Sequence, residues 1–249
     1  MSADRAELMQ QSRFVGMITP SGNTVVERVT IAMLREFPEV SCHFSRTAVH
    51  GAVDPFPDSY DWDSMIGAAR LLAHANPEII AWSGSKAGSI AFDLDRELRR
   101  RVTAETGCRA TTSTLALVDA LAALGTKRVA LISPYAPAYQ KKVLATFARE
   151  GLDCVADACA GLTDNLSYAS MEPEDIRALA LQVAAAKPDA IVAWCTNFLA
   201  APLAREIEQE TGAVLLDSAA LVVWHMLAML GLDTARAAAW GRLMVLRAT

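Results

Sequence analysis

Short apolar runs bounded by turn residues alternate along the chain with longer stretches in which apolar positions recur at helical spacing. The runs predict buried parallel strands, and the periodic stretches predict helices. The predicted strands cover residues 14–19, 40–49, 109–112, 128–132, 152–158 and 213–216, together with the runs that follow Pro77 and Pro188. The predicted helices cover residues 25–37, 64–75, 90–106, 113–124, 139–150, 198–211 and 218–230, and another begins near residue 172. This alternation predicts an α/β fold with helices on both faces of parallel sheets.

Two of the apolar runs resemble each other. The run after Pro188 passes through a tryptophan to Cys195, and the run after Pro77 passes through a tryptophan to Ser83 and Gly84. The repetition predicts two similar flavodoxin-like halves related by pseudo-two-fold symmetry, with the active site in the cleft between them. We place the halves at residues 1–125 and 126–249, and the terminal helix 218–231 is a candidate to pack back on the first half.

The first copy of the repeated run has no cysteine where the second has Cys195. A thiol at the carboxyl end of a parallel strand lies where open α/β sheets bind ligands. The helix predicted over 198–211 would place its N-terminal amides beside this thiol and favour a thiolate or a bound carboxylate. The alternative is an inert buried thiol, because cysteine is among the most buried residue types.

Composition limits the classes of partner. The 249 residues carry a net charge of −5, which argues against general nucleic-acid binding, and no apolar run approaches a membrane span. The five cysteines are odd in number and lack C-x-x-C spacing, which predicts reduced thiols in a cytoplasmic protein and no metal site. Hydrophobic residues make up 53% of the chain. The apolar last helix is compatible with a homodimer or a higher homo-oligomer.

Five short motifs follow one another in the order typical of one enzyme superfamily. They lie at residues 20–24 (Pro-Ser-Gly-Asn-Thr), 133–135 (Ser-Pro-Tyr), 164–166 (Asp-Asn-Leu), 195–197 (Cys-Thr-Asn) and 217–224 (from Asp-Ser to Trp). With these motifs the chain resembles the aspartate/glutamate racemase superfamily, in the branch that holds maleate cis-trans isomerases and arylmalonate decarboxylases. Racemases and maleate isomerases of this group carry a cysteine in each half. Arylmalonate decarboxylases have a single cysteine, in the second half, and a glycine followed by small hydroxyl residues in the first. Gly84 and Ser85 resemble the latter arrangement, although Lys86 stands where a second hydroxyl residue is expected.

The resemblance implies a cofactor-independent reaction of a small mono- or dicarboxylate. Its catalytic positions correspond to Cys195, Gly84 and Ser83, and its substrate-binding positions to Pro20, Ser21, Asn23, Ser85, Tyr135, Asn165 and Thr196. Lys86 could pair with a second substrate carboxylate or serve a structural role. His225, on an apolar helix, is expected to be a satisfied core or interface residue.

Three functions remain open. The first choice is a decarboxylase of a substituted malonate, in which Cys195 protonates the enediolate. Gly84 favours it, because serine is a far weaker nucleophile than cysteine without a partner base. The second is a maleate-type cis-trans isomerase or a related racemase, using Cys195 with Ser83 or a water in place of the missing thiol. The third is a non-catalytic protein that kept the carboxylate cleft.

Overall fold

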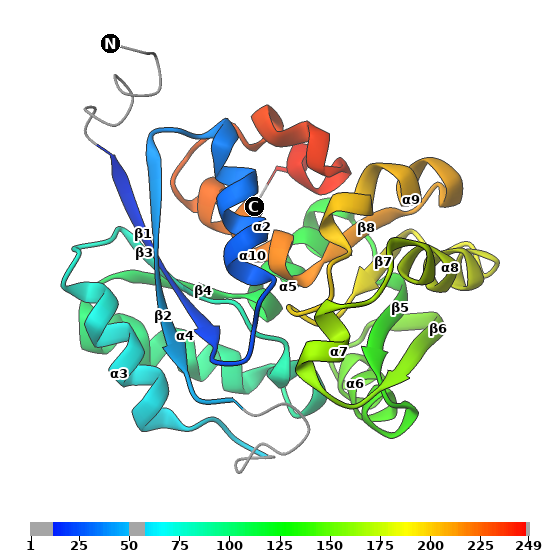
Figure 1. Ribbon diagram of the computed structural model, residues 1–249, viewed down its shortest axis with the longest axis horizontal. Coiled ribbons are helices and arrows are strands. Elements are labelled where there is room, and N and C mark those ends of the chain that lie inside the picture. The colour runs from blue at the N-terminus through cyan, green and yellow to red at the C-terminus, as the bar shows by residue number, and fades with distance from the viewer. Residues whose placement is uncertain (1–11, 50–57, 248–249) are drawn as a thin grey trace.

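The chain forms two four-stranded parallel sheets, one in each half (Figure 1). The computed structural model describes residues 12–49 and 58–247. The first sheet has the order β2-β1-β3-β4, from strands β1 (Arg13–Pro20), β2 (Val40–Thr47), β3 (Ile79–Trp82) and β4 (Arg109–Thr112). The second has the order β6-β5-β7-β8, from strands β5 (Arg128–Tyr135), β6 (Asp153–Leu162), β7 (Ala190–Ala193) and β8 (Val214–Asp217). The identical order confirms the prediction of two similar parallel-sheet halves.

Helices cover both faces of each sheet. Those of the first half are α2 (Val26–Met33), α3 (Trp62–Ala73), α4 (Asp93–Thr106) and α5 (Ser113–Leu124). Those of the second are α6 (Pro137–Arg149), α7 (Asn165–Ala169), α8 (Pro173–Ala184), α9 (Ala204–Thr211) and α10 (Ser218–Met229). Short 3₁₀ helices are η1 (Leu34–Glu36), η3 (Lys86–Ser89), η4 (Ala201–Leu203), η5 (Thr234–Trp240) and η6 (Arg242–Val245). Figure 1 shows α2, α5 and α10 between the two sheets.

The helix α10 follows the last strand of the second sheet but packs against α5 and α2 of the first half. It is apolar on almost every side, and nine of its residues are buried, including Trp224. A helix that is hydrophobic all round is buried in a core. The principal apolar cluster accordingly runs from β1 and α2 through α5 and α10 into the second sheet, so both halves share one core.

One predicted helix is wrong in its first third. Residues 198–200 are not helical, η4 follows at Ala201–Leu203, and α9 begins only at Ala204. Pro202 lacks an amide proton and disfavours helical geometry at the residue before it, which explains the late start. Several other elements extend beyond their predicted boundaries: β5 continues through Ser133 to Tyr135, β6 continues to Leu162, and α6 begins at Pro137. The strand Arg109–Thr112 and the helix Ser113–Leu124 match their predictions.

The prolines and aromatic residues of the stretch 51–63 predict a long loop, but residues 51–57 lie outside the described residues. Residues 58–61 lead into α3, which includes the last two residues of the stretch. Among the residues that the structure describes, every helix is too short or too polar to span a membrane.

Candidate active site

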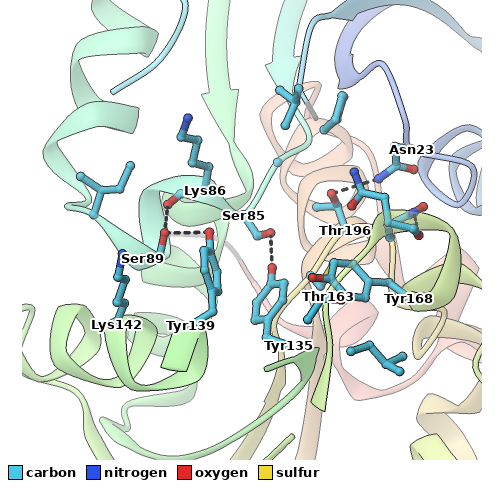
Figure 2. Close-up of a pocket in the computed structure, with 18 of the residues that line it drawn as sticks. Asn23, Ser85, Lys86, Ser89, Tyr135, Tyr139, Lys142, Thr163, Tyr168 and Thr196 are labelled. Carbon is cyan, nitrogen blue, oxygen red and sulfur yellow. Dashed lines mark hydrogen bonds between the residues drawn. The ribbon is translucent and has the colours of Figure 1, made fainter. Parts of the chain in front are cut away.

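A cavity of about 390 Å³ lies between the two halves, at the carboxyl ends of the strands (Figure 2). From the first half it is lined by Pro20, Asn23, Val49, Asp58, Trp82, Gly84, Ser85, Lys86, Ser89 and Ile90. From the second half it is lined by Tyr135, Ala136, Tyr139, Lys142, Leu162, Thr163, Asn165, Tyr168, Cys195, Thr196 and Asn197. Eight of the ten predicted site residues are among them, and Ser21 and Ser83 are not.

Cys195 is the cysteine that reaches this cavity. It follows β7 directly after Trp194, is 5% exposed, and its main-chain amide donates a 3.1 Å hydrogen bond to Oγ of Ser218. Burial raises the pKa of the Cys195 thiol to about 12; hydrogen bonds from the Asn197 amide and the Tyr135 hydroxyl lower it, and the Asp217 carboxylate raises it. The group is therefore a protonated thiol at neutral pH.

This corrects the expected electrostatics of the site. The thiol does not lie at the N-terminus of α9, because a turn and η4 separate Cys195 from that helix. The N-terminus of α9 therefore does not offset the cost of burying a thiolate. The sequence pattern missed this because the run after Cys195 has helical spacing, whereas the proline at 202 delays the helix.

Gly84 lines the cavity on the wall formed by the first half. A Cβ atom on Gly84 would lie 2.1 Å from Cζ2 of the Trp82 indole, far inside van der Waals contact. The indole is fixed, since Trp82 is 2% exposed and its Nε1 donates a 3.1 Å hydrogen bond to the Tyr60 hydroxyl. Tyr60 in turn donates to the buried carboxyl group of Asp95 at 2.5 Å. Trp82 thus occupies the space of a side chain at position 84.

The two neighbouring serines differ in access. Ser83 is fully buried, and its hydroxyl has no hydrogen-bond partner within the described part of the chain. Ser85 lines the cavity, and its Oγ lies 2.9 Å from the Tyr135 hydroxyl (Figure 2). Trp194 fixes this segment from below, because its Nε1 donates to the Ser85 carbonyl oxygen at 3.1 Å. The hydroxyl available to a ligand is therefore that of Ser85.

Asn23 and Thr196 form the other end of the cavity. The Asn23 side-chain oxygen accepts the amides of Val25 (2.9 Å) and Val26 (2.8 Å), which orients its NH₂ group toward Thr196 Oγ1 at 3.2 Å. Pro20 lines the cavity beside them. Ser21, in the same turn, is exposed, and its hydroxyl is engaged with the main chain of Val49.

Asn197 is a residue that the sequence analysis did not include in the site. Its Oδ1 accepts the Thr24 amide at 2.9 Å, and its Nδ2 donates to the Asn165 carbonyl oxygen at 2.6 Å. It therefore links the turn that bears Asn23 to the segment that bears Asn165. The signal for it was its place in the Cys-Thr-Asn motif.

Further lining residues also escaped the sequence analysis, among them Ser89, Tyr139, Lys142, Thr163 and Tyr168. Tyr139 and Lys142 lie three residues apart on α6 and so share one helix face. The sequence shows that Tyr139 and Lys142 share a helix face, but it does not show that this face lies against η3 at the cavity.

The remaining candidates lie outside the cavity. Nδ1 of His225 is 2.8 Å from the Thr111 hydroxyl and its Nε2 is 2.9 Å from Asp119, which makes it a satisfied packing residue as expected. The described residues contain no group of three or more His, Cys, Asp or Glu that could hold a metal ion.

Comparison with known proteins shows which proteins this chain resembles. The model of the arylmalonate decarboxylase family matches residues 35–244. The chain is 29% identical over 246 residues to a maleate isomerase of Nocardia farcinica, covering 93% of this chain and 95% of the relative. It is 23% identical over 237 residues to an arylmalonate decarboxylase of Bordetella bronchiseptica, covering 92% and 95% of the two chains. Both a lyase and isomerases are therefore among its relatives.

The fold comparison agrees. A cysteine-to-serine mutant of the Nocardia farcinica maleate cis-trans isomerase, solved with a covalently bound succinylcysteine intermediate, superposes with a TM-score of 0.83 at 25% identity. The match covers 93% of this chain and 98% of that one. The fold, with its two similar halves, is thus that of this group of proteins.

Proposed function

The chain belongs to the arylmalonate decarboxylase family, and we propose that it is a cofactor-independent decarboxylase of a small substituted malonate, with Cys195 as the proton donor. The observation that carries the proposal is the asymmetry of the cavity. One wall presents the thiol of Cys195, and the other presents Gly84, with Trp82 filling the space that a second thiol would need.

In the proposed reaction one carboxylate of the malonate is held and the other leaves. The NH₂ group of Asn23, the Thr196 hydroxyl and Asn165 hold the retained carboxylate. The bond from the central carbon to the second carboxylate breaks, carbon dioxide leaves, and the electron pair spreads over the retained carboxylate as an enediolate. The hydroxyls of Ser85 and Tyr135 are donors placed to stabilise this growing charge. The apolar surface of Trp82 disfavours the departing carboxylate.

The Cys195 thiol then transfers its proton to the enediolate carbon, and the thiolate regains a proton from water. The raised pKa of this thiol supports the role, since the group rests in the protonated form that a proton donor needs. A nucleophile would need the thiolate instead. With a single donor on one wall, the proton reaches one face of the planar intermediate.

The test is a proton NMR time course in D₂O with phenylmalonate, using the wild type and Cys195→Ser. We expect the monoacid with one deuterium on the α-carbon, formed by the wild type and lost or strongly slowed in the variant. Equal rates in the two proteins would overturn the role of Cys195. Binding of the diacid without turnover would instead support a non-catalytic carboxylate-binding protein.

A maleate-type isomerase is the second candidate, favoured by the 29% identity to a maleate isomerase over almost the whole chain. That reaction, as the resemblance implies, adds a nucleophile to the double bond. Ser83 is buried outside the cavity lining, so a water would have to serve, or Ser85 without a partner base. Fumarate formed from maleate in the same NMR experiment, without loss of carbon dioxide, would establish the isomerase and exclude the decarboxylase.

A further inference from the structure

The cavity continues past the Ser85–Tyr135 pair into a second polar region. Lys86 and Ser89 line it from η3, and Tyr139 and Lys142 line it from α6. Figure 2 shows these four residues together on one side of the pocket, with Asn23 and Thr196 on the other side of the Ser85–Tyr135 pair. None of these four has a role in the decarboxylation described above.

Hydrogen bonds join η3 and α6, the two elements that form this region. The hydroxyls of Ser89 and Tyr139 lie 2.8 Å apart, and the Ser89 hydroxyl is 2.9 Å from the Lys86 carbonyl oxygen. Arg149, near the end of α6, donates to the Ile90 carbonyl oxygen at 2.6 Å. The spacing between this region and Cys195 is therefore fixed by the packing of one half on the other.

The region also differs in charge from the rest of the chain. Among the residues that the structure describes, the charged side chains that line the cavity are Lys86, Lys142 and Asp58, so cations outnumber anions there in a protein whose net charge is −5. Lys86 is partly buried and Lys142 is exposed at the rim. Ammonium groups on flexible stems suit an anion whose distance from the reacting carbon is not fixed to within a fraction of an ångström.

The volume allows a substrate that reaches both regions. The cavity of about 390 Å³ falls in the range of roughly 300–1,000 Å³ typical of pockets that enclose drug-sized ligands. A plain malonate or maleate would leave the lysine side of it to water. A substituent on the malonate carbon would extend past the Ser85–Tyr135 pair toward the two lysines.

We propose that Lys86 and Lys142, beside the hydrogen-bonded pair of Ser89 and Tyr139, form a distal anion subsite, so that the substrate is a malonate whose substituent ends in a carboxylate. The inference rests on the proposed function for the reacting end of the substrate. The subsite itself recognises a charge that takes no part in the chemistry. It selects among malonates by the far end of the substituent.

Binding of the two product acids tests the subsite without turnover. Phenylacetate and 4-carboxyphenylacetate are titrated calorimetrically into the wild type, Lys86→Gln, Lys142→Gln and the double variant. The matched control is Lys141→Gln, an exposed lysine on the same helix that does not line the cavity. We expect the dicarboxylate to bind the wild type about fivefold more tightly at low salt, an advantage typical of one partly exposed ion pair.

The same advantage should shrink in each cavity-lysine variant, vanish in the double variant, persist in Lys141→Gln and weaken as salt is raised. Equal affinity of the wild type for the two acids, or an advantage that survives the double variant, would overturn the subsite. Decarboxylation of phenylmalonate and of its 4-carboxy derivative is followed in parallel. Absence of turnover with a retained binding preference would refute the decarboxylase and leave the subsite standing.

Discussion

The hydroxyls of Ser85 and Tyr135 lie 2.9 Å apart and join the two halves of the molecule beside the Cys195 thiol. Tyr135 therefore contacts both the donor of the proposed proton and the first-half hydroxyl. We expect Tyr135→Phe to lower kcat by roughly 10²-fold, the scale of losing one donor to a developing oxyanion. A double-mutant cycle with Ser85→Ala, measured as phenylmalonate decarboxylation, should show strong non-additivity, because either change disrupts the same pair. Simple additivity of the two losses would show that the pair does not act as a unit.

Asn197 holds together two segments of the cavity wall, the turn that bears Asn23 and the segment that bears Asn165. Asn197→Ala removes the hydrogen bonds to Thr24 and Asn165, and because Asn197 is 2% exposed both groups lose a buried partner. We expect a loss of about 1–3 kcal/mol in the free energy of unfolding and a higher KM. Asn197→Asp keeps the acceptor for the Thr24 amide, so its free energy of unfolding should lie between those of the wild type and Asn197→Ala. Urea denaturation and steady-state kinetics measure the effects, and wild-type values for Asn197→Ala would contradict the role.

The Trp82 indole makes Gly84 intolerant of any side chain. Gly84→Ala should destabilise the protein by about 1–3 kcal/mol, the usual cost of overpacking a well-filled site, and should lower activity by displacing the indole. Gly67 in α3 is the matched control, because a Cβ there meets nothing within 4 Å. Gly67→Ala should leave stability unchanged or raise it by about 0.5–1 kcal/mol, as expected in a helix interior. Thermal unfolding of the two variants makes the comparison, and a similar Tm for both would refute it.

The state of the Cys195 thiol predicts the basic side of the activity profile. Since burial raises its pKa to about 12, the thiol stays protonated well above neutral pH. We expect kcat/KM for phenylmalonate to hold level from pH 7 to about 9.5, beyond the ordinary thiol value of about 8.5. A decline centred near that ordinary value would show that the thiol titrates as if it were exposed.

Asp217 couples stability to pH. Burial raises its pKa to about 7 despite hydrogen bonds from several main-chain amides, whereas an unfolded aspartate titrates near about 3.9. Between these values the folded protein binds a proton that the unfolded chain has released, so this group's contribution to stability is lost as the pH rises from 4 to 7. Asp217→Asn keeps an N-cap acceptor for α10 and removes the titration.

The stability of Asp217→Asn relative to the wild type should therefore improve between pH 4.5 and pH 8, as measured by urea unfolding at both. The same substitution at the exposed cap residue Asp233, measured at the same two pH values, is the control for replacing a cap carboxylate by an amide. An offset for Asp217→Asn that does not depend on pH would contradict the prediction.

The sequence predicted the fold well because its two strongest signals are local. The run from Arg109 to Thr112 and the periodic stretch from Ser113 to the glycine at 125 coincide with a strand and a helix. Left-handed geometry at Gly125 ends that helix. The repetition of one pattern along the chain then predicts two similar sheets, as observed.

The site was less predictable because much of it depends on contacts between the halves. Ser83 and Ser85 look equivalent in the sequence, yet one hydroxyl is buried and the other faces the cavity. The side chain of Trp82 excludes any neighbour at position 84, and that relation exists only in three dimensions. Likewise, Lys142 becomes a cavity residue only because α6 packs on η3.

The last helix has a consequence for exchanging parts between relatives. Asp217 and Ser218 begin α10 beside Cys195, while the body of the helix covers α2 and α5 of the other half. Consider a chimaera that takes its first half from one relative and its second half from another. Its first half would have packed against the α10 of the first parent, but the chimaera carries the α10 of the second parent. The side chains of residues 218–229 would have to pack against the first half, while the start of the helix would have to continue from the last strand of the second half. Substitutions in either half that change the packing around α10 therefore have to be compatible with the other half as well.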